Sequence, residues 1–376
     1  MGIFSIKGSE AFDERIQADL NEIVEEVREM PEADHFVALV LMGGYGRGEG
    51  TPFIREGKEE PFNDYDLIVV GRNVGRLRRR ILKRSLHAAE QRLSARLNLP
   101  VDLFFHTQSG LKQSEQSLMN YELRNGHRVL WGPTDALNMM PQFSAKAIPP
   151  SEGTRLLMNR GSLLLMLKQK HRSLRELGQR DYVEAVKYMA KAWLAMGDCL
   201  LLAQQRYGVS YIQKEAEIVQ LPSLDGLVDQ AWLIEHYLKA IAFRSWGDPE
   251  VFRHEDLDAL LARTIKVYSS FFLWYESQRL GDQFLDIEGY EAQLRQNTGQ
   301  PEGACKSLAL NLLLLWAGAL SPSPQYLLKH PRYRLFAALL LLLERKNQPL
   351  ACQLLAEKGT WDALVQKYFR LWERLS

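Results

Sequence analysis

Three aspartates in the first third of the chain have the spacing of a divalent-cation site. Asp64 and Asp66 are two residues apart at the start of an apolar run, so on a strand they share one face. Asp102 stands between apolar residues in a later run, Val101–Phe105. Carboxylates gathered on one face repel each other unless cations bind them, and Mg²⁺ (or Mn²⁺) prefers hard oxygen ligands. We expect two ions, because ions about 3.5–4 Å apart can hold the attacking and leaving oxygens of a phosphoryl displacement.

A glycine-rich segment lies upstream of these acids. An apolar, strand-like run, Phe36–Met42, ends directly in Gly43 and Gly44, and Arg47 follows. Glycines let the backbone turn sharply and let amide groups approach an anion. The segment therefore predicts a phosphate-binding turn. A dinucleotide-binding fold is the alternative, but the glycines do not have GxGxxG spacing and no long helix follows directly.

The elements around these residues alternate between helix and strand. Apolar periodicity predicts helices over Ser9–Met30 and Asn73–Asn98, and short apolar runs predict strands over 36–42, 64–70 and 101–105. This order predicts a compact domain with an α/β sheet. The expected inner face of the second helix comprises Leu77, Ile81, Leu82, Ala89, Leu93 and Leu97. The polar stretch 51–63 is expected to be a loop.

In this order, the motifs resemble the signature of the DNA polymerase β-like nucleotidyltransferase superfamily. Leu41–Glu49 resembles its "hG[GS]…RG" turn, Asp64-Tyr65-Asp66-Leu67 its "[DE]h[DE]h" element, and Val101-Asp102-Leu103 its third acid. The resemblance covers roughly the first 110 of 376 residues. It implies a small mixed sheet with flanking helices. It also implies transfer of a nucleoside monophosphate from a nucleoside triphosphate to a hydroxyl, with release of pyrophosphate.

The resemblance implies catalytic and metal-binding roles for the three acids. Asp64 and Asp66 would bind both metal ions. Asp102 would complete the metal site and help to lower the pKa of the attacking hydroxyl.

The same resemblance assigns the phosphates to the glycine turn. Gly43 and Gly44 would bind the β- and γ-phosphates, with Arg47 in the same signature. Position 44 is glycine where the superfamily often has serine, so backbone amides would have to replace one hydroxyl. The segment 45–63 is longer than is usual for the superfamily, and we interpret the extra residues as a substrate lid.

Beyond residue 150, leucine-rich helical periodicity replaces the strand patterns. The predicted fold is thus an α+β nucleotidyltransferase domain (1–145) plus a larger all-α C-terminal region. Gln296–Gly303 is the predicted boundary between a helical domain (150–300) and a C-terminal helical subdomain (301–376). Helices are expected over 152–171, 182–206, 227–243, 255–279, 305–320, 332–346 and 348–357.

Lys187 and Lys191 are one helical turn apart in the predicted helical domain. Helical domains in the superfamily often provide a lysine to the triphosphate, so both are candidate ligands. The alternative is a charged outer stripe of the helix.

Composition limits the partners. Net charge is +1 and 46% of the residues are hydrophobic, so no global field attracts nucleic acid or an anionic membrane. The basic run Arg76–Arg84 is interpreted as the solvated face of a helix, because no aromatic residues are interleaved with it. The apolar stretches Leu308–Leu320 and Leu335–Leu343 are shorter than the roughly 20 residues that span a bilayer. Three scattered cysteines indicate reduced thiols and a cytoplasmic protein.

Several functions remain open at this point. The leading one is nucleotidyl transfer to a hydroxyl of a small molecule or a protein, the latter as in toxin–antitoxin-type nucleotidyltransferases. A non-catalytic nucleotide-binding or scaffold protein that retains the fold is the second. A fused RNase of the higher-eukaryote-and-prokaryote nucleotide-binding type is disfavoured, because no histidine beyond residue 150 follows an arginine at four to six residues. The base preference, the acceptor and the oligomeric state are not predicted.

Overall fold

The structure is a computed structural model that describes residues 2–55, 57–171, 173–248, 252, 255–296, 303–321 and 323–375. It divides into two compact units. The first unit comprises Met1–Pro149, Gln205–Gln220 and Ile241–Val251, and the second comprises Pro150–Gln204, Leu221–Ala240 and Phe252–Ser376. Two short stretches of the predicted helical domain therefore belong with the N-terminal part. Of the predicted boundary near residue 300, residues 297–302 lie outside the described residues.

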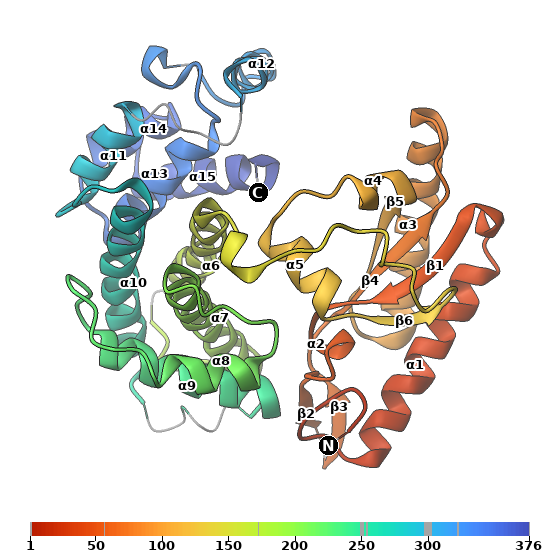
Figure 1. The fold of residues 1–376 in the computed structure, drawn as a ribbon. Coiled ribbons are helices and arrows are strands. Elements are labelled where there is room, and N and C mark those ends of the chain that lie inside the picture. The colour runs from red at the N-terminus through yellow and green to blue at the C-terminus, as the bar shows by residue number, and fades with distance from the viewer. Residues whose placement is uncertain are drawn as a thin grey trace. The chain divides into compact units, whose positions relative to one another are not determined.

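A four-stranded mixed sheet is the centre of the first unit (Figure 1). Its strand order is β5-β4-β1-β6, with bounds Val101–Thr107, Tyr65–Gly71, Phe36–Leu41 and Arg128–Trp131. β1 is antiparallel to both β4 and β6, whereas β4 and β5 are parallel. This is the small mixed sheet that the resemblance implies. It leaves β5 at the edge of the sheet.

Helices α1 (Glu10–Arg28) and α3 (Arg76–Leu97) form one hydrophobic core with the sheet. Because Leu82, Leu86, Ala89 and Leu93 recur at helical spacing, they make the buried seam of α3. The prediction was wrong for Leu77 and Ile81, which are 75% and 39% exposed. These two residues lie about 100° or more around the helix from that seam, so they point away from the core.

Residues 52–61 form a hairpin where a loop was expected. β2 (Pro52–Arg55) pairs in antiparallel register with β3 (Lys58–Pro61). Phe62 follows the hairpin and contacts both the Phe53 ring (centroids 5.2 Å apart) and the Phe243 ring (5.7 Å). The segment was taken for a loop because its charged residues mask the strand pattern. Whether the hairpin acts as a substrate lid stays a prediction.

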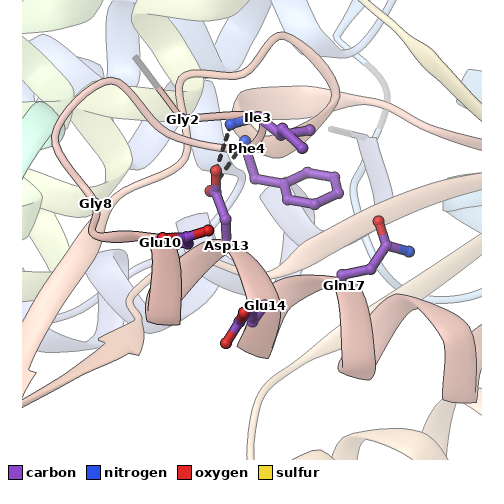
Figure 2. A pocket seen from close by; sticks show the side chains of 8 residues that line it. All are labelled: Gly2, Ile3, Phe4, Gly8, Glu10, Asp13, Glu14 and Gln17. Carbon is purple, nitrogen blue, oxygen red and sulfur yellow. Dashed lines mark hydrogen bonds between the residues drawn. The ribbon is translucent and has the colours of Figure 1, made fainter.

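The N-terminal segment packs beside the glycine-rich segment. Figure 2 shows the Asp13 carboxylate on α1 accepting hydrogen bonds from the amides of Ile3 and Phe4. The carbonyl of Phe4 in turn accepts a hydrogen bond from the amide of Gly50 (2.8 Å). A cavity of about 510 Å³ opens next to Asp13, and none of the predicted site residues lines it. The N-terminal segment therefore fixes the end of the glycine-rich segment.

All regular elements among the described residues of the second unit are helices. Its core includes α13 (Arg332–Glu344), in which every residue from Tyr333 to Leu343 is buried. The other helices with residues in this unit are α6 (Pro150–Lys170), α7 (Gln179–Ala203), α9 (Gln230–Trp246), α10 (Leu257–Leu280), α11 (Ile287–Gln296), α12 (Ala304–Trp316), α14 (Gln348–Leu355) and α15 (Trp361–Leu375). The sequence analysis missed α11 and α15, and also α8 (Tyr211–Ile218) in the first unit. Within the described part of the chain, no helix combines the length and apolarity that crossing a membrane requires.

Candidate active site

The structure brings the three predicted acids together. Asp64 immediately precedes β4, Asp66 lies on β4, and Asp102 is its direct partner on the parallel strand β5. One carboxylate oxygen from each residue lies within 4.8 Å of the others. Asp64 is exposed and the other two are half-buried, so the cluster is open to solvent on one side. Three hard oxygen donors in this arrangement fit a divalent cation such as Mg²⁺ or Mn²⁺.

Tyr65 fixes the orientation of the two acids beside it. Its side chain is fully buried on the opposite face of the sheet, where its hydroxyl donates to the Asp19 carboxylate (2.9 Å). The Tyr65 ring also packs against the Tyr45 ring, with centroids 5.1 Å apart. Because alternate strand residues point to opposite faces, this anchor holds Asp64 and Asp66 on the same side. The sequence analysis assigned no role to Tyr65 or Asp19.

The surroundings of Asp102 are unfavourable to its negative charge. Burial raises the pKa of Asp102, and the nearby carboxylates of Asp64 and Glu90 raise it further. Glu90 comes from α3, and its carboxylate accepts the amide of Leu103 on β5 (2.7 Å). A bound cation would offset the raised pKa of Asp102, because it would stabilise the charged form of this carboxylate.

Gly43 brings the glycine turn against this cluster. Its φ is +68°, a left-handed conformation that favours glycine. A Cβ atom at this position would lie 2.7 Å from Oδ2 of Asp66, so a side chain there would displace that carboxylate. The neighbouring amide of Met42 donates to the Asp66 carbonyl (2.9 Å). The predicted phosphate turn and the predicted metal ligands are therefore adjacent.

Gly44 makes room for an arginine that the sequence analysis missed. A Cβ atom at position 44 would lie 2.9 Å from Nη2 of Arg244. The Arg244 guanidinium lies over the Tyr211 ring, 4.8 Å from its centroid, and its Nε atom is buried without a hydrogen-bond partner among the described residues. Arg244 is thus a cation beside the glycine turn. No local pattern identifies it, because the two residues are far apart in the sequence.

Arg47 lies in a buried network of ion pairs. Its guanidinium contacts the carboxylates of Glu49 (3.4 Å) and Glu122 (3.6 Å), and its side chain is 8% exposed. The predicted phosphate ligand thus already has two carboxylate partners.

The same network attaches residues 205–220 to the first unit. Ser210 and the amide of Tyr211 both donate to the Glu49 carboxylate, at 2.7 and 2.9 Å. The fully buried Lys214 lies 3.7 Å from the Glu122 carboxylate. Burial alone would raise the pKa of Glu122, but the cations of Lys214 and Arg47 outweigh burial and lower it. These charges hold the segment that carries Tyr211, and hence the ring under Arg244.

Lys187 and Lys191 lie on α7 in the second unit, whereas the acids and the glycine turn lie in the first. Their expected contact with the triphosphate stays a prediction.

Comparison with known proteins does not assign this chain to a family. No protein-family model matches the chain, and no curated protein matches it. Among solved structures, the chain is similar to spectinomycin adenyltransferase AAD(9) from Enterococcus faecialis, determined with ATP and spectinomycin. The sequence identity is 13% and the TM-score 0.36, over 66% of this chain and 98% of that one. A likeness at this level does not identify an activity, so the functional argument depends on the geometry of the site.

Proposed function

We propose that this protein is a nucleotidyltransferase that uses Mg²⁺ or Mn²⁺. It transfers a nucleoside monophosphate from a nucleoside triphosphate to a hydroxyl of a small molecule or a protein. The observation that carries the proposal is the convergence of Asp64, Asp66 and Asp102 within 4.8 Å, with Gly43 directly against Asp66. A cation site beside a turn open to phosphate is what phosphoryl displacement requires.

In the proposed reaction, the acceptor oxygen forms a bond to the α-phosphorus and the bond to the β-phosphate oxygen breaks. Pyrophosphate leaves with the electron pair, and the acceptor hydroxyl releases its proton to the solvent that reaches the exposed side of the cluster. Asp64 and Asp66 would hold the divalent cations, which, when bound, would neutralise charge on the triphosphate and lower the pKa of the acceptor hydroxyl. Asp102 lies on the edge strand β5, where an acceptor can approach from the open side of the sheet. It would accept a hydrogen bond from that hydroxyl and orient it.

The glycine turn and Arg244 would bind the phosphates. Backbone amides at a glycine turn can approach phosphate oxygens closely, and a guanidinium can donate two parallel hydrogen bonds to them. Gly44 occupies the position at which the superfamily that the motifs resemble often has serine. In this chain a larger residue there would contact Arg244. We therefore infer that the Arg244 guanidinium takes over the function of the missing hydroxyl.

The direct test uses triphosphates labelled at the α-phosphate. Each labelled triphosphate is incubated with the protein, a divalent cation and a cell lysate that supplies the acceptor. Label should appear on a small molecule or a protein, with an equal amount of pyrophosphate. Binding of triphosphate without pyrophosphate release would contradict the proposal and favour the non-catalytic alternative.

The matched variants are Asp64→Asn with Asp66→Asn, and Asp135→Asn as a control, since Asp135 is an exposed acid of the same unit. The double variant should lose pyrophosphate release and keep its melting temperature, and the control should keep both. If the double variant loses only stability, the acids are structural.

A further inference from the structure

One strongly basic surface of the first unit has no part in the proposed transfer. It comprises Arg76, Arg79 and Lys83 from α3, with Phe104 and His106 from β5, and we call it the α3–β5 surface. The three cations recur at helical spacing, so they share one side of α3. All three are exposed, and Phe104 is 45% exposed although it lies within a strand. Exposed aromatic rings beside unneutralised cations are typical of a binding surface.

Among the described residues, the cations of this surface have no acidic partners, in contrast to those farther along the same helix. Near the C-terminal end of α3, Arg92 pairs with Glu26 (2.6 Å) and Arg96 also pairs with Glu26 (3.1 Å). None of the cations of the α3–β5 surface forms an ion pair with any described residue. Exposed cations without an ion-pair partner are available to bind an anionic ligand.

The N-terminal end of α3 is also an unfavourable place for positive charge. A helix N-terminus carries a partial positive charge, and acids are favoured there. The first turn of α3 contains no acidic residue and begins with Arg76. A local cost of this kind, without a compensating contact, is expected at functional positions.

The two elements of the surface lie side by side. The Glu90 carboxylate on α3 accepts the amide of Leu103 on β5 (2.7 Å), so this side of the helix lies along the strand. Burial lowers the pKa of His106, and the charges of Arg79 and Lys83 lower it further, in keeping with this arrangement. Phe104 and His106 alternate with buried residues on β5, so they share the face that carries Asp102. At about 3.3 Å per residue, Phe104 lies about 7 Å along the strand from Asp102 and His106 about 13 Å. The surface therefore extends from the acidic cluster to the basic helix.

We propose that the α3–β5 surface binds a segment of single-stranded nucleic acid. A base would stack on Phe104, and backbone phosphates would contact Arg79 and Lys83. Single strands present unstacked bases to aromatic side chains, whereas the bases of a duplex are stacked on each other. A run of aspartates and glutamates would use the cations but has no aromatic group to stack on the ring. The sequence analysis found no aromatic residue within the basic run; the fold supplies one from the neighbouring strand.

The test measures fluorescence anisotropy of a labelled 12-nucleotide RNA of mixed sequence. Chelator is present and triphosphate is omitted, so the outcome is independent of the proposed transfer. The variants are Arg79→Ala with Lys83→Ala, Phe104→Ala and Phe104→Tyr. The control is Lys58→Ala with Lys146→Ala, which removes two exposed cations elsewhere in the first unit. Melting temperatures of all variants confirm that each is folded.

The wild type should bind the RNA, and affinity should fall as salt rises. Removing Arg79 and Lys83 should reduce the slope of log affinity against log salt by about 1.4, since each phosphate contact to a single strand contributes about 0.7. Phe104→Ala should bind about tenfold more weakly with little change in slope, and Phe104→Tyr should bind like the wild type. Unchanged affinity and slope in the folded variants would overturn the proposal. Stronger competition by duplex or by polyglutamate than by unlabelled RNA would also overturn it.

Discussion

Among the described residues, two clusters of potential metal ligands differ in how their surroundings affect the acids. In the first unit, Asp64, Asp66 and Asp102 have ligand atoms within 4.8 Å of one another. In the second unit, the ligand atoms of His171, Asp181 and Glu184 also lie within 4.8 Å of one another. By residue type and spacing alone, either cluster could be a metal site.

The second cluster already contains a cation. Lys170 donates to the carboxylates of both Asp181 and Glu184. Hydrogen bonding to Lys170 lowers the pKa of each of these acids. At Asp102 the shift has the opposite direction, because burial and the neighbouring carboxylates raise its pKa. The two clusters therefore differ in the direction in which their surroundings shift the pKa of an acid: upward at Asp102, downward at Asp181 and Glu184.

The largest expected effect is the difference in pyrophosphate release between variants that lack the acids of one cluster and variants that lack those of the other. Asp64→Asn with Asp66→Asn should reduce pyrophosphate release on the order of a thousandfold or more, because the charges that hold the cations are lost. Asp181→Asn with Glu184→Gln should leave the rate unchanged. The measurement is steady-state pyrophosphate release at saturating triphosphate. Equal losses of pyrophosphate release in both double variants would mean that the first cluster has no special role in catalysis.

The next largest effect is expected from replacing Arg244, on the KM for triphosphate. Arg244→Ala should raise the KM for triphosphate about tenfold with a smaller change in kcat, because a charge-assisted contact to a phosphate is lost. Gly44→Ala should have a similar effect, since its methyl group would meet the guanidinium. An exposed arginine of the first unit, Arg80, provides the control as Arg80→Ala. If Arg244→Ala leaves KM unchanged, the guanidinium does not bind the triphosphate.

Removing the internal cation of the second cluster should have a smaller effect. Lys170→Met should lower the melting temperature by at most a few degrees, because exposed ion pairs contribute little to stability. Pyrophosphate release should not change. Thermal unfolding and the activity assay check the two statements, and a large loss of activity would show that the second cluster is not merely structural.

The smallest expected effect is a difference between the two clusters in how folding stability changes with pH. A raised pKa at Asp102 means that the folded chain binds this proton more tightly than the unfolded chain. Without metal, Asp102 therefore favours folding at low pH, and this contribution is lost as pH rises from its ordinary value of 3.8 through the raised value. Glu184, with a lowered pKa, stabilises the fold above its ordinary value of 4.5, and this contribution is lost as pH falls.

Melting temperatures of the wild type, Asp102→Asn and Glu184→Gln between pH 3 and pH 7, in chelator, check this prediction. On acidification the wild type should gain stability relative to Asp102→Asn and lose stability relative to Glu184→Gln. If acidification changes the stability of the wild type in the same direction relative to both variants, the opposite pKa shifts of Asp102 and Glu184 are contradicted.

The sequence predicted the parts of the site that depend on local periodicity. Asp64 and Asp66 could be placed on one face because a strand alternates with period two, and the apolar run around Asp102 identified a second strand. The glycine turn followed from residue type. The pairing of Asp66 with Asp102 across parallel strands required the sheet, and the resemblance implied only that a mixed sheet exists.

The surroundings of Gly44 and Arg47 could not be predicted from the sequence, because they depend on contacts between segments that are distant in the chain. Arg244 reaches Gly44 only because residues 241–251 return to the first unit. The ion pairs of Arg47 with Glu49 and with the distant Glu122 were not predicted, and its expected contact with the phosphates stays a prediction. The exposed positions of Leu77 and Ile81 show that an apolar residue on a helix does not always mark its inner face.

Electron paramagnetic resonance of Mn²⁺ tests the central claim most directly. Titration of the wild type with Mn²⁺ in the presence of a triphosphate should show bound ions. Asp181→Asn with Glu184→Gln should bind the same number, and Asp64→Asn with Asp66→Asn should bind none beyond the free nucleotide. Wild-type binding that survives the loss of Asp64 and Asp66 would contradict the account.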